Sequence, residues 1–153
     1  MDDMVIEDAR EDDLPEVVRL LADDTFGQSR ERAVDPLPVG YRRAFAAIDA
    51  DPRSRLLVAR RAGRVVGTLQ LHYLANLTYQ GGERCQIEGV RVACDCQGQG
   101  LGRRLIAWVV ERARERGCVM VQLTTNAGRP EARRFYEGLG FTASHVGMKR
   151  DLN

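Results

Sequence analysis

The spacing of apolar residues along this chain alternates between the two-residue period of strands and the longer period of amphipathic helices. Leu14, Val17 and Leu21 show the helical spacing, and Asp12 or Asp13 would cap that helix ahead of Pro15. The patterns predict strands at 4–9, 55–61, 65–75, 84–93 and 118–124, short strands from Phe141 and at 146–149, and helices at about 12–26, 38–50, 100–116 and 130–140.

Glycine and proline residues mark the ends of these segments. Gly63 lies in the turn of a predicted hairpin, Gly117 stops the third helix, and Pro130 opens the last one. The apolar run at 118–124 is typical of a strand inside a sheet. The order β-α-α-β-β-β-α-β-α-β-β predicts an α/β (mixed α+β) fold. It would form a single mixed, mostly antiparallel sheet of six to seven strands with helices on both faces.

Composition narrows the class of protein. The chain has 153 residues, 44% of them hydrophobic and 29% charged, which predicts one globular domain over residues 1–153. A net charge of +1 gives no reason to expect nucleic acid or a membrane surface as a partner. No apolar run approaches a membrane span, and the acidic N-terminus lacks a signal-peptide pattern, so we expect a cytoplasmic protein.

The cysteines do not suggest a metal centre. A cytoplasmic protein would keep the four cysteines as free thiols. Cys94 and Cys96 are one residue apart, but the two histidines of the chain show no spacing that would complete a zinc site. We therefore expect no bound metal.

The most informative segment runs from Val90 to Leu105. An apolar strand leads into a turn with glycine at every second position (Gly98, Gly100 and Gly102), and a helix follows at once. Glycines let a ligand approach the backbone N–H groups, and the start of a helix adds unpaired donors and the positive end of its dipole. The segment therefore predicts an anion site, typically for a phosphate or pyrophosphate.

Two common glycine motifs do not fit this turn. A P-loop would require Lys and then Ser or Thr after the last glycine, whereas Arg103 and Arg104 follow here. A dinucleotide fingerprint would require a different glycine spacing and an acidic residue at the end of the next strand, and residues 118–124 contain none.

Two motifs together resemble a known family. The element Gln97-x-x-Gly100-x-Gly102 and the downstream segment from Ala132 to Phe141, of the form A-x-x-x-Y-x-x-x-G-F, resemble the GNAT superfamily of acyl-CoA-dependent N-acyltransferases. Many members carry an Asn three residues before that Ala, where this chain has Arg129. Asn126 is the alternative for that contact, and the sequence leaves the choice open.

The resemblance implies acetyl-CoA as co-substrate and no metal. Its pyrophosphate would lie on the glycine turn, and its pantetheine amides and the thioester oxygen on the backbone of the preceding strand. The expected coenzyme-binding residues are Val90, Arg91, Val92, Gln97, Gly98, Gln99, Gly100, Leu101, Gly102, Arg103, Asn126, Arg129 and Tyr136.

Two side chains are candidates for proton transfer. Glu88 lies on the strand that enters the turn, between apolar neighbours, where it would be partly buried and would share a face with Val90 and Val92. It could accept the amine proton, or it could pair with Arg84 or Arg91 as a structural carboxylate. The resemblance implies that Tyr136 protonates the departing thiolate. Helical spacing would place Phe135 and Leu139 in the core and Tyr136 beside that stripe.

The molecule that would accept the acetyl group is less well defined by the sequence. Its pocket would be built from residues 26–41, the 76–82 loop and the last hairpin, with candidate linings Phe26, Tyr41, Tyr73, Asn76 and Tyr79. The expected partner is a small primary amine, and a homodimer is a further option. Residues 86–102 look much like the glucosamine-phosphate N-acetyltransferases.

These observations predict an N-acetyltransferase in which the amine attacks the thioester directly in a ternary complex. Alternatives within the class are an amino-sugar acetyltransferase and a protein N-terminal acetyltransferase. A ping-pong route through Cys94 or Cys96 is a further option. From another class, the chain could be a non-catalytic acyl-CoA-binding sensor.

Overall fold

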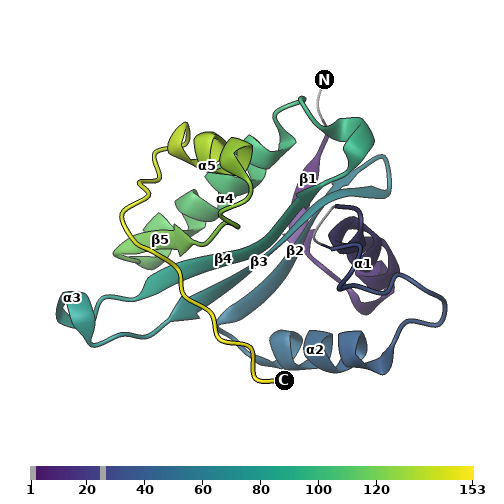
Figure 1. Ribbon diagram of the computed structural model, residues 1–153, viewed down its shortest axis with the longest axis horizontal. Coiled ribbons are helices and arrows are strands. Elements are labelled where there is room, and N and C mark those ends of the chain that lie inside the picture. The colour runs from purple at the N-terminus through teal and green to yellow at the C-terminus, as the bar shows by residue number, and fades with distance from the viewer. Residues whose placement is uncertain (1–2, 25–26) are drawn as a thin grey trace.

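The computed structural model describes residues 3–24 and 27–153. It contains one five-stranded sheet with helices on both faces (Figure 1). The elements are β1 (Val5–Asp8), η1 (Glu11–Asp13), α1 (Leu14–Ala22), α2 (Val39–Ala50), β2 (Ser54–Arg61), β3 (Arg64–Leu74), α3 (Thr78–Gly81), β4 (Arg84–Val92), η2 (Cys94–Cys96), α4 (Leu101–Arg116), β5 (Met120–Leu123) and α5 (Pro130–Glu137).

The sheet confirms the predicted fold class but has fewer strands. Its order is β1-β2-β3-β4-β5, with antiparallel neighbours up to β4 and a parallel pairing of β4 with β5. The prediction of strands from Phe141 and at 146–149 was wrong, because residues 141–153 form no helix or strand. Val146 and Met148 remain 89% and 90% exposed, so their alternation buries no apolar face. β5 is consequently the last strand in the sheet order and is half-buried, not interior.

Both faces of the sheet pack against helices. On one face α4 buries the apolar stripe expected from its sequence, and this stripe packs on Leu57, Leu69, Leu71 and Ile87 from three strands. On the other face α1 contributes Leu14, Val17 and Val18. Figure 1 shows α1 and α2 on the side of the sheet opposite α4 and α5. The central strands are therefore fixed from both sides.

A buried ion pair joins η1 to the sheet. Asp13 has a side chain only 7% exposed, and both of its oxygens lie 3.0 Å from Nη2 of Arg60 on β2. Its Oδ2 also accepts the backbone N–H of Arg10 at 2.9 Å. This carboxylate thus supports both the turn before α1 and the guanidinium beside it.

Replacing Asp13 by Ala would leave the Arg60 guanidinium without this partner, and we expect the free energy of unfolding to fall by about 3 kcal/mol. Urea unfolding followed by circular dichroism measures the change. Asp95→Ala is the matched control, because its partner Arg64 and Asp95 have exposed side chains (52% and 63%) and such pairs contribute little. Equal losses in the two variants would contradict a special role for the buried pair.

Candidate active site

The second half of β4 has a free edge. β4 pairs with β3 as far as Val92, whereas its parallel pairing with β5 stops at Ile87 opposite Leu123. In the described part of the chain no strand lies beside residues 88–92 on that edge. Their backbone groups on this side can therefore bind a ligand, as the sequence suggested for Val90 to Val92.

A β-bulge lies in this same segment. Gln70 pairs with Glu88 and Thr68 with Arg91, so Gly89 and Val90 together oppose the single residue between them on β3. Gly89 has φ of +62°, a conformation that favours glycine. The extra residue reverses the alternation of side chains. The prediction that Glu88 shares a face with Val90 and Val92 was therefore wrong, because Glu88 shares a face with Arg91 instead.

Two carbonyls of this segment accept hydrogen bonds from side chains. Nη1 of Arg91 donates to the carbonyl of Val90 at 2.8 Å, and Nε2 of Gln97 donates to the carbonyl of Val92 at 3.3 Å. A side-chain donor can rotate away from a carbonyl when a ligand offers that carbonyl a hydrogen bond, whereas the backbone donors of a paired strand are fixed. These two acceptors are therefore available to a ligand that carries amide N–H groups.

The glycine turn continues from this edge into α4. Gly98 and Gly100 have φ of +79° and +78°, and a Cβ on either would meet no atom within 4 Å. Gly100 is the N-cap of α4, whose first turn holds no acidic residue. The first N–H groups of this 16-residue helix have no helical partner, and Arg103 is exposed beside them. This open, electropositive turn fits a pyrophosphate.

Tyr136 lies where α5 packs against the core. Its ring makes edge contacts with Phe135 (5.1 Å between centroids) and Phe141 (5.8 Å). Burial raises the pKa of its hydroxyl, and the positive charges of Arg91 and Arg129 oppose part of that shift. Leu139 packs on the core as predicted, but the prediction for Phe135 and Tyr136 was wrong, since Tyr136 packs on the core while Phe135 stays 38% exposed.

Asp24 connects three elements of the site, a role that the sequence did not indicate. Its Oδ2 lies 2.8 Å from Nε of Arg91 and 3.0 Å from Nη2 of Arg129. Burial would raise the pKa of Asp24, but the Gly27 N–H and these two guanidinium groups outweigh burial and hold it below its usual value. The carboxylate therefore links the end of α1 to β4 and to the start of α5.

The structure also shows the contacts of Arg129 and Asn126, the two residues that could take the place of the Asn that many members of the family carry before α5. The side chain of Arg129 is directed at Asp24. Oδ1 of Asn126 accepts the N–H of Gly128 at 2.8 Å and so closes the turn before α5. In this structure both residues shape the entry to α5.

Glu88 is more exposed than its sequence neighbours suggested. Its side chain is 58% exposed, on the face of the sheet opposite that of its buried neighbour Ile87, and the expectation of partial burial was wrong. Neither proposed arginine partner is engaged with it. Arg91 binds Asp24, and Arg84 donates to Thr78 and Gln122. In the described residues the nearest possible ion-pair partner of Glu88 is His72, whose Nε2 lies 3.9 Å from Oε2.

The predicted acceptor residues do not converge on one pocket. Phe26 lies outside the described residues. Tyr41 accepts the N–H of Arg32 and donates to Glu31, both at 3.0 Å, which holds the chain before α2. Tyr73 is 6% exposed in the core. Tyr79 lies in α3 and Asn76 just before it, and α3 precedes the start of β4, at the end of that strand opposite the glycine turn (Figure 1).

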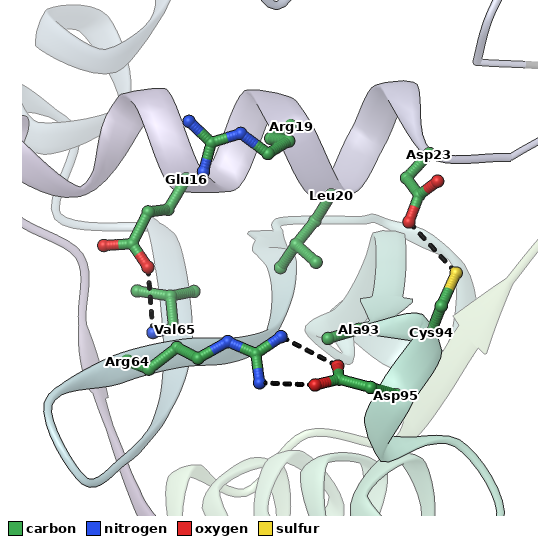
Figure 2. Close-up of a pocket in the computed structure, with 9 residues that line it drawn as sticks. All are labelled: Glu16, Arg19, Leu20, Asp23, Arg64, Val65, Ala93, Cys94 and Asp95. Carbon is green, nitrogen blue, oxygen red and sulfur yellow. Dashed lines mark hydrogen bonds and ion pairs between the residues drawn. The ribbon is translucent and has the colours of Figure 1, made fainter.

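A cavity of about 290 Å³ lies instead between α1, the start of β3 and η2. Figure 2 shows Cys94 at its rim, with Sγ donating to Oδ2 of Asp23 at 3.0 Å. This hydrogen bond to a carboxylate raises the pKa of the Cys94 thiol, and Cys96 is buried. Neither cysteine is thereby activated as a thiolate nucleophile.

Within residues 3–24 and 27–153, no group of three or more His, Cys, Asp or Glu side chains is arranged to hold a metal ion. None of the helices in those ranges is both long enough and apolar enough to cross a membrane.

Comparison with known proteins agrees with this geometry. The model of the acetyltransferase (GNAT) family matches residues 14–141. The aminoalkylphosphonate N-acetyltransferase of Salmonella typhimurium is 37% identical over 114 residues, which cover 73% of this chain and 72% of that protein. The glucosamine 6-phosphate N-acetyltransferase of Trypanosoma brucei brucei is 37% identical over 90 residues, 59% of either chain.

A solved structure extends the similarity over nearly the whole chain. A protein described as a transcriptional regulator from Bacillus halodurans C-125 superposes with a TM-score of 0.95 at 50% identity, covering 97% of this chain and 99% of that one. The family match spans α1 to α5 and includes both the free edge of β4 and the glycine turn. This chain therefore belongs to the GNAT family and is an N-acetyltransferase.

Proposed function

We propose that the protein transfers an acetyl group from acetyl-CoA to the primary amine of a small molecule by direct attack in a ternary complex. The observation that carries this proposal is the continuous surface formed by the free edge of β4, the glycine turn and the start of α4. An extended chain of amides ending in a pyrophosphate matches this sequence of backbone acceptors and N–H donors.

The coenzyme would be held mainly by backbone. Residues Gly98 to Arg103 would bind the pyrophosphate, with Gln97 and Gln99 bordering the turn. The carbonyls of Val90 and Val92 would receive amide N–H groups after Arg91 and Gln97 release them. Arg129 and Asn126 would border the site at the start of α5. When bound, acetyl-CoA supplies the acetyl group as a thioester.

The reaction requires a proton acceptor, an oxyanion donor and a proton donor. A free alkylammonium has a pKa of about 10, so the amine must lose a proton before it attacks. Glu88 on β4 would accept this proton. Backbone N–H groups beside the bulge would stabilise charge on the carbonyl oxygen. Tyr136 would donate to the thiolate, because its raised pKa keeps the hydroxyl protonated at neutral pH.

Direct attack is favoured over an acyl-cysteine intermediate. A nucleophilic cysteine requires a lowered pKa and access to the thioester. The Asp23 carboxylate raises the pKa of Cys94, and Cys96 is buried. Both cysteines also belong to η2 and not to the free edge of β4.

The acceptor would be an amine that also carries a phosphonate or phosphate group. The names of the Salmonella and Trypanosoma relatives both describe acceptors with a phosphorus oxyacid. In this chain two guanidinium groups, from Arg91 and Arg129, share the single carboxylate of Asp24 close to Tyr136. The positive charge of this cluster would favour an anionic acceptor.

The function is tested by incubating the full-length protein with acetyl-CoA and paired amines, followed by mass spectrometry of the products. The pairs are 2-aminoethylphosphonate with ethanolamine, and glucosamine 6-phosphate with glucosamine; a peptide N-terminus is added to cover protein acetylation. We expect acetylation of the anionic member of at least one pair at ten or more times the rate of its neutral counterpart. Acetyl-CoA binding without any acetylated product would favour the acyl-CoA sensor.

Gly100→Ala should weaken acetyl-CoA binding at least tenfold in isothermal calorimetry, because a methyl group would project into the open turn. Gly117→Ala is the matched control. Gly117 ends the same helix with φ of +84° and equally open surroundings, so both variants carry the same backbone strain. Equal affinities in the two variants would exclude this turn as the pyrophosphate site.

Tyr136→Phe keeps the ring and removes the hydroxyl. We expect kcat to fall roughly 10²-fold or more, as for other proton donors. In the described residues no hydrogen bond involves this hydroxyl, so the melting temperature should change by less than about 2 °C, the lower end of the shift that 1 kcal/mol produces in a domain of this size. A loss of kcat below about threefold would leave Tyr136 a packing residue only.

A further inference from the structure

A chain of polar side chains crosses β2, β3 and β4 on the face that carries Glu88. His72 on β3 is the centre of this chain, with Ser54 opposite it on β2 and Gln86 opposite it on β4. Nδ1 of His72 lies 2.9 Å from Oγ of Ser54, and its Nε2 lies 2.9 Å from Nε2 of Gln70. This imidazole, with its side chain 26% exposed, is therefore held at both nitrogens.

The hydrogen bonds determine the tautomer of this imidazole. Ser54 has a single hydroxyl hydrogen, and it donates this hydrogen to Oδ2 of Asp51 at 2.9 Å. Asp51 is a carboxylate and can only accept, since the N–H of Arg53 and the Ser54 hydroxyl hold its pKa below the usual value. Oγ of Ser54 must therefore accept from His72, which places the imidazole hydrogen on Nδ1.

Nε2 of His72 is consequently left with its lone pair. That atom accepts the amide N–H of Gln70 and lies 3.9 Å from Oε2 of Glu88. The distance exceeds a direct hydrogen bond but is within reach of one side-chain rotation or one water molecule. The charged groups that face His72 in the described residues are Asp51, through Ser54, and Glu88 across the strand.

We propose that Nε2 of His72 is the terminal acceptor of the proton that Glu88 removes from the acceptor amine. This inference rests on the proposed N-acetyl transfer. The ammonium N–H bond breaks, the proton passes through the Glu88 carboxylate, and a new N–H bond forms at Nε2. The result is a neutral amine, an unchanged carboxylate and an imidazolium. The Gln70 amide, which donates to Nε2 in the structure, would turn away as this bond forms. Both imidazolium N–H groups then have acceptors, Glu88 at one end and Ser54 at the other.

The chemistry of the two groups explains this division of roles. An imidazole is in general a stronger base than a carboxylate, so the ring retains a proton that the carboxylate passes on. A base matched to the working pH removes protons more efficiently. The carboxylate attracts the ammonium group, and the imidazole keeps the proton away from the amine until it has attacked.

The tautomer can be measured without substrate. Only two histidines occur in the chain, so ring ¹⁵N–¹H correlation spectra of the full protein give few signals, and His72→Gln identifies those of His72. We expect hydrogen on Nδ1 and a lone pair on Nε2, with Ser54→Ala shifting the ring towards a mixture of tautomers. A neutral His72 with its hydrogen on Nε2 would overturn the proposal, whatever the outcome of the acetylation assay.

Kinetics with an acceptor from the amine panel test the catalytic role. His72→Gln should lower kcat by about tenfold or more and move the acidic limb of the kcat/KM profile to lower pH. Glu88→Gln should lower kcat roughly 10²-fold or more. Gln122→Ala is the matched control, because Gln122 bonds Gln86 and Arg84 near the same chain and cannot hold an extra proton.

An unchanged pH profile and near-normal kcat in His72→Gln would overturn the role of His72. Proton release from Glu88 directly to solvent would then suffice. Loss of turnover with an unchanged acidic limb would assign His72 a structural role and also contradict the proposal. Failure to acetylate any amine in the wild-type protein would instead contradict the proposed function, while the spectra would still report the tautomer.

Discussion

The one-sided pairing of β4 is the constraint on which the candidate site depends. β4 bonds β3 along its length but leaves β5 after Ile87, and a bulge at Gly89 and Val90 changes its alternation just beyond that point. A central strand normally satisfies its backbone groups on both edges. Here one edge is available for a ligand, and the helices on both faces keep the strand in place despite the missing neighbour.

The bulge also determines which side chains of β4 lie on the same face of the sheet. Before it, Ile87 faces α4 and Glu88 faces the α1 side; after it, Arg91 lies on the same side as Glu88. Arg91 can then form its ion pair with Asp24, and its charge opposes the rise in the pKa of Tyr136. Glu88 lies 3.9 Å from His72. Without the extra residue, Arg91 would point towards α4. A single inserted position thus determines which charged groups surround the free edge.

Charge at the site is shared between elements that are distant in sequence. Asp24, Arg91 and Arg129 come from α1, β4 and the start of α5, and their ion pairs hold these elements together. The Asp51–Ser54–His72 chain similarly connects the end of α2 to β3. The Ser54–His72 pair lies on the face of the sheet that carries Glu88, opposite the apolar residues that pack against α4.

The sequence by itself determined the five strands of the sheet, the four longer helices and the glycine turn. The apolar stripe of α4, the hairpin at Gly63 and the turn at Gly98 to Gly102 follow from local spacing and backbone preference, which act within a few residues. Only the tertiary structure decided the exposure of Glu88, the failure of residues 146–149 to form a strand, and the partners of Arg91, Arg129 and His72. Those features depend on strand register and on contacts between distant segments; the one-residue bulge in β4, for example, decides on which face Arg91 lies.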